Sequence, residues 1–389
     1  MTTHRYLVIG GGLTAHAAAT AIRELDAGGS LAMIAAEPEP PYARPPLTKG
    51  LWKGKPEDSV FYPPVPGLVL LAGRRAVALD TRARTVRDGA GGEHRYERLL
   101  LATGATPRRL PFGGDRVIYF RTIDDYRRVR AVAGERIVVI GAGFIGSEIA
   151  AALASNGKRV TMVFPEEAIG SRAYPRDLAA YVTRYYEERG VVVRRGEGVA
   201  AIEGRGDETV VRTTGGAEVP CDAVIAGLGV RPDTALAEAA GIRCDDGILV
   251  DERLETSAPD VYAAGDVARF PSEALGELIR VEHEDAALTM GRTAGQVMAG
   301  ADVRYRHLPF FYSDLFDLGY EAVGRLEPRL EVVERWKKPF REGVVYYLDR
   351  GRVRGVLLWG VFGQVDAARQ LIERGSAIAP EALQGAIGV

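Results

Sequence analysis

The sequence predicts an α/β protein with two doubly wound domains and a smaller α+β domain at its C-terminal end. Two segments, starting at Tyr6 and at Arg136, repeat one order of strand, Gly-rich turn, helix, strand and acidic residue. This order is typical of doubly wound sheets. Strand-like runs at 344–348 and 353–359, followed by a helix from about 364 to 374, predict the third region. A chain of 389 residues is also too long for one ordinary core.

Composition and charge exclude several classes of protein. The chain is 47% hydrophobic and 26% charged, which is typical of a globular protein, and its net charge of -2 leaves no electrostatic surface for nucleic acid. It has no run of 18 apolar residues and no N-terminal targeting segment, so we expect a cytoplasmic protein. The two cysteines, Cys221 and Cys244, form no CxxC, so neither a disulfide framework nor a zinc site is expected.

The two Gly-rich turns carry the chemistry that a dinucleotide needs. The first glycine permits the tight turn, the second lets a pyrophosphate approach the backbone, and the third small residue lets the helix pack on the strand. The N-terminus of the helix then offers N–H groups to the phosphates, and the acidic residue accepts hydrogen bonds from ribose hydroxyls. The residues concerned are Gly10, Gly12, Ala15 and Glu37 in the first copy and Gly141, Gly143, Gly146 and Glu166 in the second.

One such turn alone is weak evidence, since Gly-rich turns often only reverse the chain. Two copies, each in its full context, indicate two dinucleotide sites. Two sites in one chain imply two different dinucleotides, a tightly held flavin and a nicotinamide.

Further segments carry a family resemblance. They are the turn at Thr103-Gly104, the buried strand leading to Gly229, and the run from Thr256 through Tyr262-Ala263-Ala264-Gly265 to Asp266. With the paired turns, these segments resemble the two-dinucleotide flavoprotein superfamily over nearly the whole chain. The resemblance implies an FAD domain at 1–110 and 228–304, an inserted NAD domain at 111–227 and a C-terminal domain at 305–389. It also implies that Asp266 hydrogen-bonds the flavin ribityl chain.

The segment 41–52 points to a branch of that superfamily without a redox disulfide. Many relatives carry a reactive cysteine here, and this segment has none, which excludes a disulfide reductase or a cysteine-based peroxidase. The segment is similar to the reductases of small iron–sulfur carriers and to the apoptosis-inducing-factor group. The windows 280–295, 311–315 and 319–324 resemble the second group more closely. Tyr312 stands where that group typically has Trp, and Glu284 replaces a second His, which argues against a cell-death or DNA-binding role.

The resemblance assigns roles to individual side chains. Lys49 and Glu148 match a pair beside the flavin N5; two surface charges are the alternative. Arg44 is expected to pair with the FAD pyrophosphate, and Phe144 to gate or stack, unless it only packs between strand and helix. Glu282 and His283 are expected on the flavin side, with Tyr312 nearby; His283 could instead be an ordinary residue at the start of a helix. With five His in the chain and none at metal spacing, no metal site is expected.

The predicted function is hydride transfer from NADH to FAD, then electron transfer to an unidentified acceptor. Glu166 and Glu167 repel a 2′-phosphate and favour NADH, while Arg172 lies close enough in sequence to weaken that preference. Two alternatives remain: an NADH-dependent reductase of ferredoxin or rubredoxin, and a redox-sensing interaction protein with a long-lived charge-transfer complex. The acceptor could be a quinone, oxygen or a small iron–sulfur protein, and the chain is expected to be a monomer or a redox-dependent homodimer.

Overall fold

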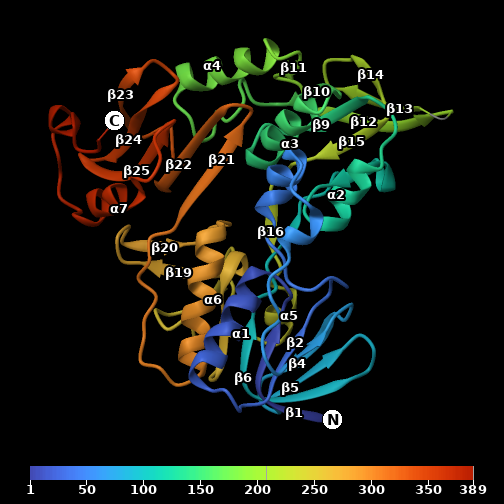
Figure 1. The fold of residues 1–389 in the computed structure, drawn as a ribbon, viewed down its shortest axis with the longest axis vertical. Helices are drawn as coiled ribbons and strands as arrows, with labels where there is room; N and C mark the ends of the chain where they lie inside the picture. Colours follow the sequence, from blue (N-terminus) through green and yellow to red (C-terminus); the bar gives the residue numbers. More distant parts are fainter. Residues whose placement is uncertain (207, 389) are drawn as a thin grey trace. The chain divides into compact units, whose positions relative to one another are not determined.

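The computed structural model describes residues 1–206 and 208–388, and the chain divides into two compact units. Unit 1 consists of Met1–Ala43, Asp58–Thr106 and Arg231–Pro309. Unit 2 consists of Arg44–Glu57, Pro107–Val230 and Phe310–Val389. Unit 1 contains a mixed sheet that is parallel at its centre and unit 2 contains a parallel sheet, each with helices (Figure 1), so the predicted α/β class is confirmed.

Unit 1 is built on a seven-stranded sheet whose central strand begins the chain. The run Tyr6–Ile9 is buried, because parallel neighbours flank it on both sides and the sheet faces are covered. The sheet order is β3 (Leu68–Leu71), β2 (Leu31–Ile34), β1 (Thr2–Ile9), β6 (Glu93–Leu101), β5 (Thr85–Asp88) and β4 (Ala76–Asp80), and β18 (Val261–Ala263) also pairs with β6.

Two helices of unit 1 pack side by side, α1 (Leu13–Leu25) and α6 (Glu284–Met298) (Figure 1). The close approach depends on small residues. A Cβ at Gly291 would lie 2.4 Å from the carbonyl oxygen of Thr14, and one at Gly295 would lie 2.3 Å from that of Ala18. The Ala-rich sequence of α1 and these glycines therefore hold the helix that follows the first Gly-rich turn. The remaining elements are α5 (Ala235–Ala239), β17 (Ile248–Leu249), β19 (Ala268–Ser272) and β20 (Glu277–Ile279).

Unit 2 repeats the same parallel arrangement. Its sheet order is β11 (Val192–Arg195), β10 (Arg159–Phe164), β9 (Arg136–Ile140), β15 (Ala223–Ala226) and β8 (Val117–Tyr119). In both sheets the first strand of the repeat lies between its second strand and a later returning strand. The helices are α2 (Ile123–Arg130), α3 (Phe144–Ser155) and α4 (Arg176–Glu187), and β12 (Val199–Arg205), β13 (Glu208–Thr213) and β14 (Glu218–Cys221) form a separate antiparallel sheet.

The C-terminal part of unit 2 is an antiparallel five-stranded sheet with one helix, drawn from orange to red in Figure 1. The predicted strands at 344–348 and 353–359 and the predicted helix after them are confirmed. The elements are β21 (Phe310–Leu315), β22 (Leu318–Gly324), β25 (Arg352–Trp359), β24 (Glu342–Asp349), β23 (Glu331–Lys338) and α7 (Val365–Glu373).

Short segments complete the chain. The excursion Arg44–Glu57, which falls inside the predicted FAD domain, groups with unit 2 and consists mainly of two short 3₁₀ turns, η1 (Pro45–Thr48) and η2 (Gly50–Lys53). Two short strands, β7 (Ala105–Pro107) and β16 (Val230–Pro232), contain the points where the chain leaves and re-enters unit 1. No helix within the described residues combines the length and the apolar character needed to cross a bilayer.

Candidate functional site

The first Gly-rich turn in unit 1 joins β1 to α1. Gly10 has a φ of +129°, and a Cβ there would lie 2.1 Å from the carbonyl oxygen of Ala102, so no other residue fits. Gly12 precedes α1, and a Cβ added to it would meet no atom within 4 Å. Ala15 is fully buried. The turn therefore has one glycine required by the backbone, one that opens onto free space, and one small packing residue.

The second turn, in unit 2, has the same three environments. Gly141 has a φ of +105°, and its Cβ would lie 2.4 Å from the carbonyl oxygen of Gly227. Gly143 precedes α3 and faces open space. A Cβ at Gly146 would lie 2.2 Å from the carbonyl oxygen of Gly141, so the third position tolerates no side chain here.

Both turns fit the phosphates of a dinucleotide. In each turn the open glycine stands directly before a helix of at least 12 residues, whose first N–H groups have no partner inside the helix. A missing side chain at that point lets a pyrophosphate reach those donors. The structure thus supports two dinucleotide sites, one in each unit.

The two acidic residues after the second strands differ in their partners. Glu37 accepts a hydrogen bond of 2.5 Å from the hydroxyl of Tyr42, a neutral group. Glu166 forms an ion pair of 2.6 Å with Arg172, whose side chain is 84% exposed. Arg172 is therefore close in space to Glu166 as well as in sequence, and its positive charge offsets the charge of this carboxylate.

The segments that carry the family resemblance in unit 1 are turns held by specific contacts. The Thr103 hydroxyl donates to the carbonyl of Asp233 at 2.7 Å, and Gly104 adopts a φ of +68°. Gly265 has a φ of +77°, and a Cβ on it would lie 2.3 Å from the Thr14 hydroxyl oxygen. This close approach places the turn that bears Asp266 against the start of α1, the helix that contains Thr14.

His283 stands immediately before α6, as the N-terminal flanking residue of that helix. Burial lowers the pKa of His283 to about 4, although the carboxylates of Asp266 and Asp285 act in the opposite direction. The imidazole is therefore neutral at pH 7. Its neighbour Glu282 is exposed and forms an ion pair of 2.8 Å with Arg280.

Lys49 and Glu148 form a buried ion pair in unit 2. The Lys49 Nζ lies 2.6 Å from the Glu148 Oε2, and the side chains are 12% and 4% exposed. Two hydroxyls also donate to this carboxylate: Thr48 to Oε2 and Ser313 to Oε1, each at 2.6 Å. These short contacts rule out the alternative of two independent surface charges.

The strand β21 contacts the same group of residues. The ring of Phe311 lies 5.2 Å from that of Phe144, and the Lys49 Nζ lies 5.0 Å from the centre of the Tyr312 ring. Phe144 is 41% exposed and Tyr312 is 37% exposed, so both rings also face solvent in the chain alone. Apolar and cationic groups therefore border an open surface next to a buried carboxylate.

The remaining two predicted residues of unit 2, Arg44 and Gly229, form hydrogen bonds with backbone groups of other segments. The Arg44 guanidinium donates to the carbonyl of Arg121 at 2.8 Å. Gly229 has a φ of +76° and accepts a hydrogen bond from the Arg108 N–H at 2.9 Å. The structure gives Gly229 a turn that favours glycine, and its contact with a cofactor stays a prediction.

The predicted site residues thus form two groups. Unit 1 holds Gly10, Gly12, Ala15, Glu37, Thr103, Gly104, Asp266, Glu282 and His283, and unit 2 holds Arg44, Lys49, Gly141, Gly143, Phe144, Gly146, Glu148, Glu166, Gly229 and Tyr312. Thr48 and Ser313 are not among the residues that the sequence predicts for the site. Thr48 precedes Lys49, which is a usable signal, whereas Ser313 lies 165 positions from Glu148 and only the fold brings them together.

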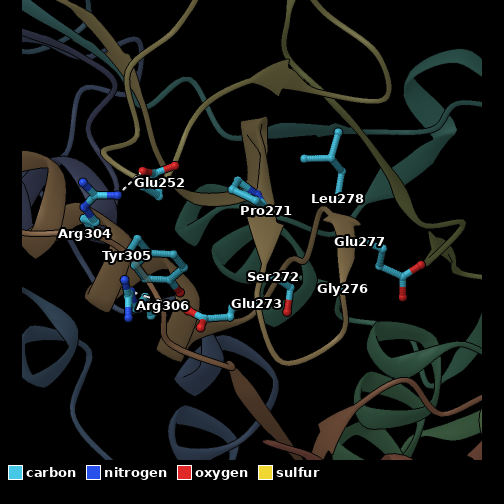
Figure 2. A pocket seen from close by; sticks show the side chains of 10 residues that line it. All are labelled: Glu252, Pro271, Ser272, Glu273, Gly276, Glu277, Leu278, Arg304, Tyr305 and Arg306. Carbon is cyan, nitrogen blue, oxygen red and sulfur yellow. Dashed lines mark hydrogen bonds and ion pairs between the residues drawn. The ribbon is translucent and has the colours of Figure 1, made fainter. Parts of the chain in front are cut away.

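A hollow of about 550 Å³ in unit 1, between the β19–β20 hairpin and residues 304–306, is lined by none of these residues (Figure 2). Its arginines are already paired: Arg304 with Glu252, and Arg306 with Glu273 at 3.5 Å. This hollow offers no unpaired arginine to a phosphate, and we assign no ligand to it. Across residues 1–206 and 208–388, no group of three or more His, Cys, Asp or Glu side chains is placed to hold a metal ion.

Comparisons with known proteins agree with this geometry. A family model described as pyridine nucleotide-disulphide oxidoreductase matches residues 4–291, and a model of the C-terminal domain of mitochondrion-associated apoptosis-inducing factor matches residues 334–374. The ferredoxin–NAD(+) reductase component of the anthranilate 1,2-dioxygenase system of Burkholderia cepacia is 33% identical, over 98% of this chain and 97% of its own.

A further relative and a solved structure are similar to this chain at about the same level of identity. Apoptosis-inducing factor 1 of Dictyostelium discoideum is 32% identical, over 95% of this chain and 78% of its own. The crystal structure of the ferredoxin reductase for the CYP199A2 system of Rhodopseudomonas palustris superposes with a TM-score of 0.90 at 30% identity, covering 98% of this chain and 96% of that one.

Proposed function

The chain belongs to the pyridine nucleotide-disulphide oxidoreductase family, and from that premise we propose that it transfers hydride from NADH to FAD and electrons onward to a small iron–sulfur protein, without a redox disulfide. The coarser part of this description follows from the family: the chain is an NAD(P)H-dependent flavoprotein oxidoreductase with FAD and NAD(P)H as cofactors. The nicotinamide preference, the acceptor and the roles of individual residues belong to the proposal.

The observation that carries the proposal is the group around Glu148. In the segment where disulfide-dependent relatives carry cysteine, this chain places Lys49 in a 2.6 Å ion pair with a buried carboxylate. A lysine paired with a glutamate has no thiol chemistry, so it can act only by position and charge. We place this pair beside the flavin ring.

Hydride transfer between stacked rings requires no protein acid or base, and FAD, when bound, supplies the step from a two-electron donor to one-electron acceptors. The chain's own residues orient the cofactors. Gly12 and Gly143 leave room for the two pyrophosphates, Asp266 and Glu37 hold the flavin nucleotide, and Glu166 holds the nicotinamide ribose. Phe144, which is exposed in the chain alone, covers the nicotinamide side of the ring and excludes water.

The choice of acceptor is supported by the relatives named ferredoxin reductases, which match this chain over nearly their whole length. An anaerobic titration with NADH, followed by oxidation with a ferredoxin, a quinone and oxygen in turn, tests it. We expect one FAD per chain, full reduction by NADH, and oxidation by a ferredoxin much faster than by quinone or oxygen. Folded protein that cannot bind FAD, or a preference for quinone, would overturn the proposal.

A second candidate is a redox-sensing interaction protein. It is favoured by the match of residues 334–374 to the apoptosis-inducing-factor domain and by the open ring of Phe144. Such a protein would show a broad long-wavelength absorption band after reduction, slow oxidation by every acceptor, and a change from monomer to dimer on sizing columns. The cytoplasmic location and the oligomeric state stay predictions.

A further inference from the structure

The Glu148 carboxylate is the meeting point of three separate parts of unit 2. It projects from the second turn of α3. Thr48 and Lys49, from the excursion between residues 44 and 57, contact Oε2, and Ser313, from β21, contacts Oε1. Each contact is 2.6 Å long. Contacts between a carboxylate and donors at this distance are strong, and a carboxylate that is 4% exposed has little water to replace them.

Lys49 is the cation that faces Glu148, and three tyrosines are other titratable groups near this carboxylate. Burial raises the pKa of the nearby hydroxyls of Tyr174, Tyr186 and Tyr320, and the negative charge of Glu148 raises each of them further. These three tyrosines are therefore neutral at pH 7. The balance of charge in this buried group is that of one lysine and one glutamate.

Three consecutive residues of β21 contact three residues to which the sequence analysis assigned catalytic roles. Phe311 packs on Phe144, Tyr312 lies under the Lys49 ammonium, and Ser313 donates to Glu148. Ser313 is 1% exposed, and the pairing of its strand with β22 fixes its backbone in the sheet. A strand of the C-terminal sheet thus reaches both members of the ion pair.

We propose that Ser313 is a positioning residue for the flavin chemistry: its hydroxyl fixes the Glu148 carboxylate against Lys49, and this balance of charge sets the flavin's tendency to accept electrons. This inference rests on the proposed function in one respect, the placement of Lys49 beside the flavin ring. Thr48 acts in the same way on the other carboxylate oxygen.

The direction of the effect follows from charge. Loss of the Ser313 hydroxyl releases the Glu148 Oε1, so the carboxylate is held less firmly against Lys49 and offsets the lysine charge less completely. The remaining positive charge favours the reduced flavin, which carries a negative charge. The midpoint potential therefore moves upward in Ser313→Ala, in the same direction as in Glu148→Gln and by a smaller amount.

The test is the midpoint potential of the holoenzyme, measured by equilibration with a reference dye during slow chemical reduction. Ser313→Ala is expected to raise the ratio of reduced to oxidised flavin several-fold at a fixed poise, while Ser313→Thr, which keeps a hydroxyl, restores the wild-type ratio. Ser272→Ala is the matched control, because it removes another buried strand hydroxyl whose contact is the backbone N–H of Leu275. It is expected to leave the potential unchanged.

The decisive comparison is a double-mutant cycle, because coupled residues deviate from additivity. In a Glu148→Gln background, Ser313→Ala is expected to cause no further change. A shift of the same size in both backgrounds, or an unchanged potential in Ser313→Ala, overturns the inference. If Ser313→Ala does not fold, Thr48→Val is measured in its place with the same expectations. The dye method needs no NADH, so a failure of NADH to reduce the wild-type flavin would contradict the proposed function alone.

Discussion

The two Gly-rich turns share one backbone conformation and differ in the third small residue, in the cover of the following helix and in the partner of the acidic residue. In the first turn the third position is Ala15, the following helix is covered by α6, and the acidic residue is held by a neutral tyrosine. In the second turn the third position must be Gly146, and the acidic residue is held by an arginine. Under the proposed function, the first turn serves a nucleotide that stays bound and the second serves a nucleotide that exchanges.

The residues that follow the two open glycines also differ in exposure. Leu13, after Gly12, is half-buried, whereas Phe144 and Ile145, after Gly143, are 41% and 42% exposed. A covered turn favours a permanently bound flavin, and an exposed one with an aromatic side chain suits a nicotinamide that enters and leaves.

Alanine at the open glycines should separate the two sites most sharply. A Cβ at Gly12 or Gly143 meets no protein atom, so both variants should fold, and the methyl group should obstruct only the phosphates. We expect Gly12→Ala to bind FAD at least about tenfold more weakly, a loss of about 1.4 kcal/mol, and Gly143→Ala to keep FAD with a higher KM for NADH. Flavin content after dialysis and NADH kinetics measure the two effects.

Gly10→Ala is the matched control for this pair. Its Cβ would overlap the Ala102 carbonyl at a φ of +129°, so we expect loss of folding rather than selective loss of a ligand. If Gly143→Ala lost FAD while Gly12→Ala kept it, the assignment of the two turns would be reversed.

The stability of unit 1 should depend on pH through His283, which is predicted to lie on the flavin side. The pKa of His283 lies at about 4 in the folded chain and at its ordinary value of 6.5 after unfolding. Between these values the unfolded chain binds more protons, so the free energy of unfolding falls as pH decreases from 6.5 towards 4. In His283→Asn this fall should be shallower, by up to about 1.4 kcal/mol per pH unit. Urea unfolding at several pH values provides the measurement, and equal slopes would show that His283 titrates normally.

A smaller effect is expected at the nicotinamide ribose. Glu166→Ala should narrow the preference for NADH over NADPH, and Arg172→Ala should widen it, because the arginine offsets the carboxylate that repels a 2′-phosphate. An ion pair with an exposed arginine is weak, so we expect changes of about two- to fivefold in the ratio of kcat/KM values. Stopped-flow reduction of the flavin by NADH and by NADPH measures these ratios. A shift towards NADPH after loss of Arg172 would contradict the prediction.

The smallest effect should come from the two cysteines. Cys221 is buried in the second nucleotide fold, and burial raises the pKa of its thiol to about 12, so it forms almost no thiolate at pH 7. We expect thiol reagents to leave flavin reduction by the wild-type protein intact, and Cys221→Ala with Cys244→Ala to leave its rate unchanged. A folded double variant without activity would restore the possibility of thiol chemistry.

The sequence by itself determined the parts of this protein that depend on neighbours in the chain. A strand, a Gly-rich turn and a helix are local; Gly10 and Gly141 are required by a backbone angle, and Gly146 by an atom close to its Cα. Both nucleotide folds, the C-terminal strands and the absence of cysteine between 41 and 52 therefore follow from the order of the residues alone.

Only the tertiary structure decided which side chains act together. The family resemblance suggested the pair Lys49–Glu148, but their burial and the two hydroxyls from Thr48 and Ser313 became visible only in the fold. The pairing of Glu166 with Arg172 was likewise open in the sequence, since an exposed arginine six positions away can point anywhere. Hydrogen bonds act over about 3 Å, and a linear pattern does not specify distances between residues 165 positions apart.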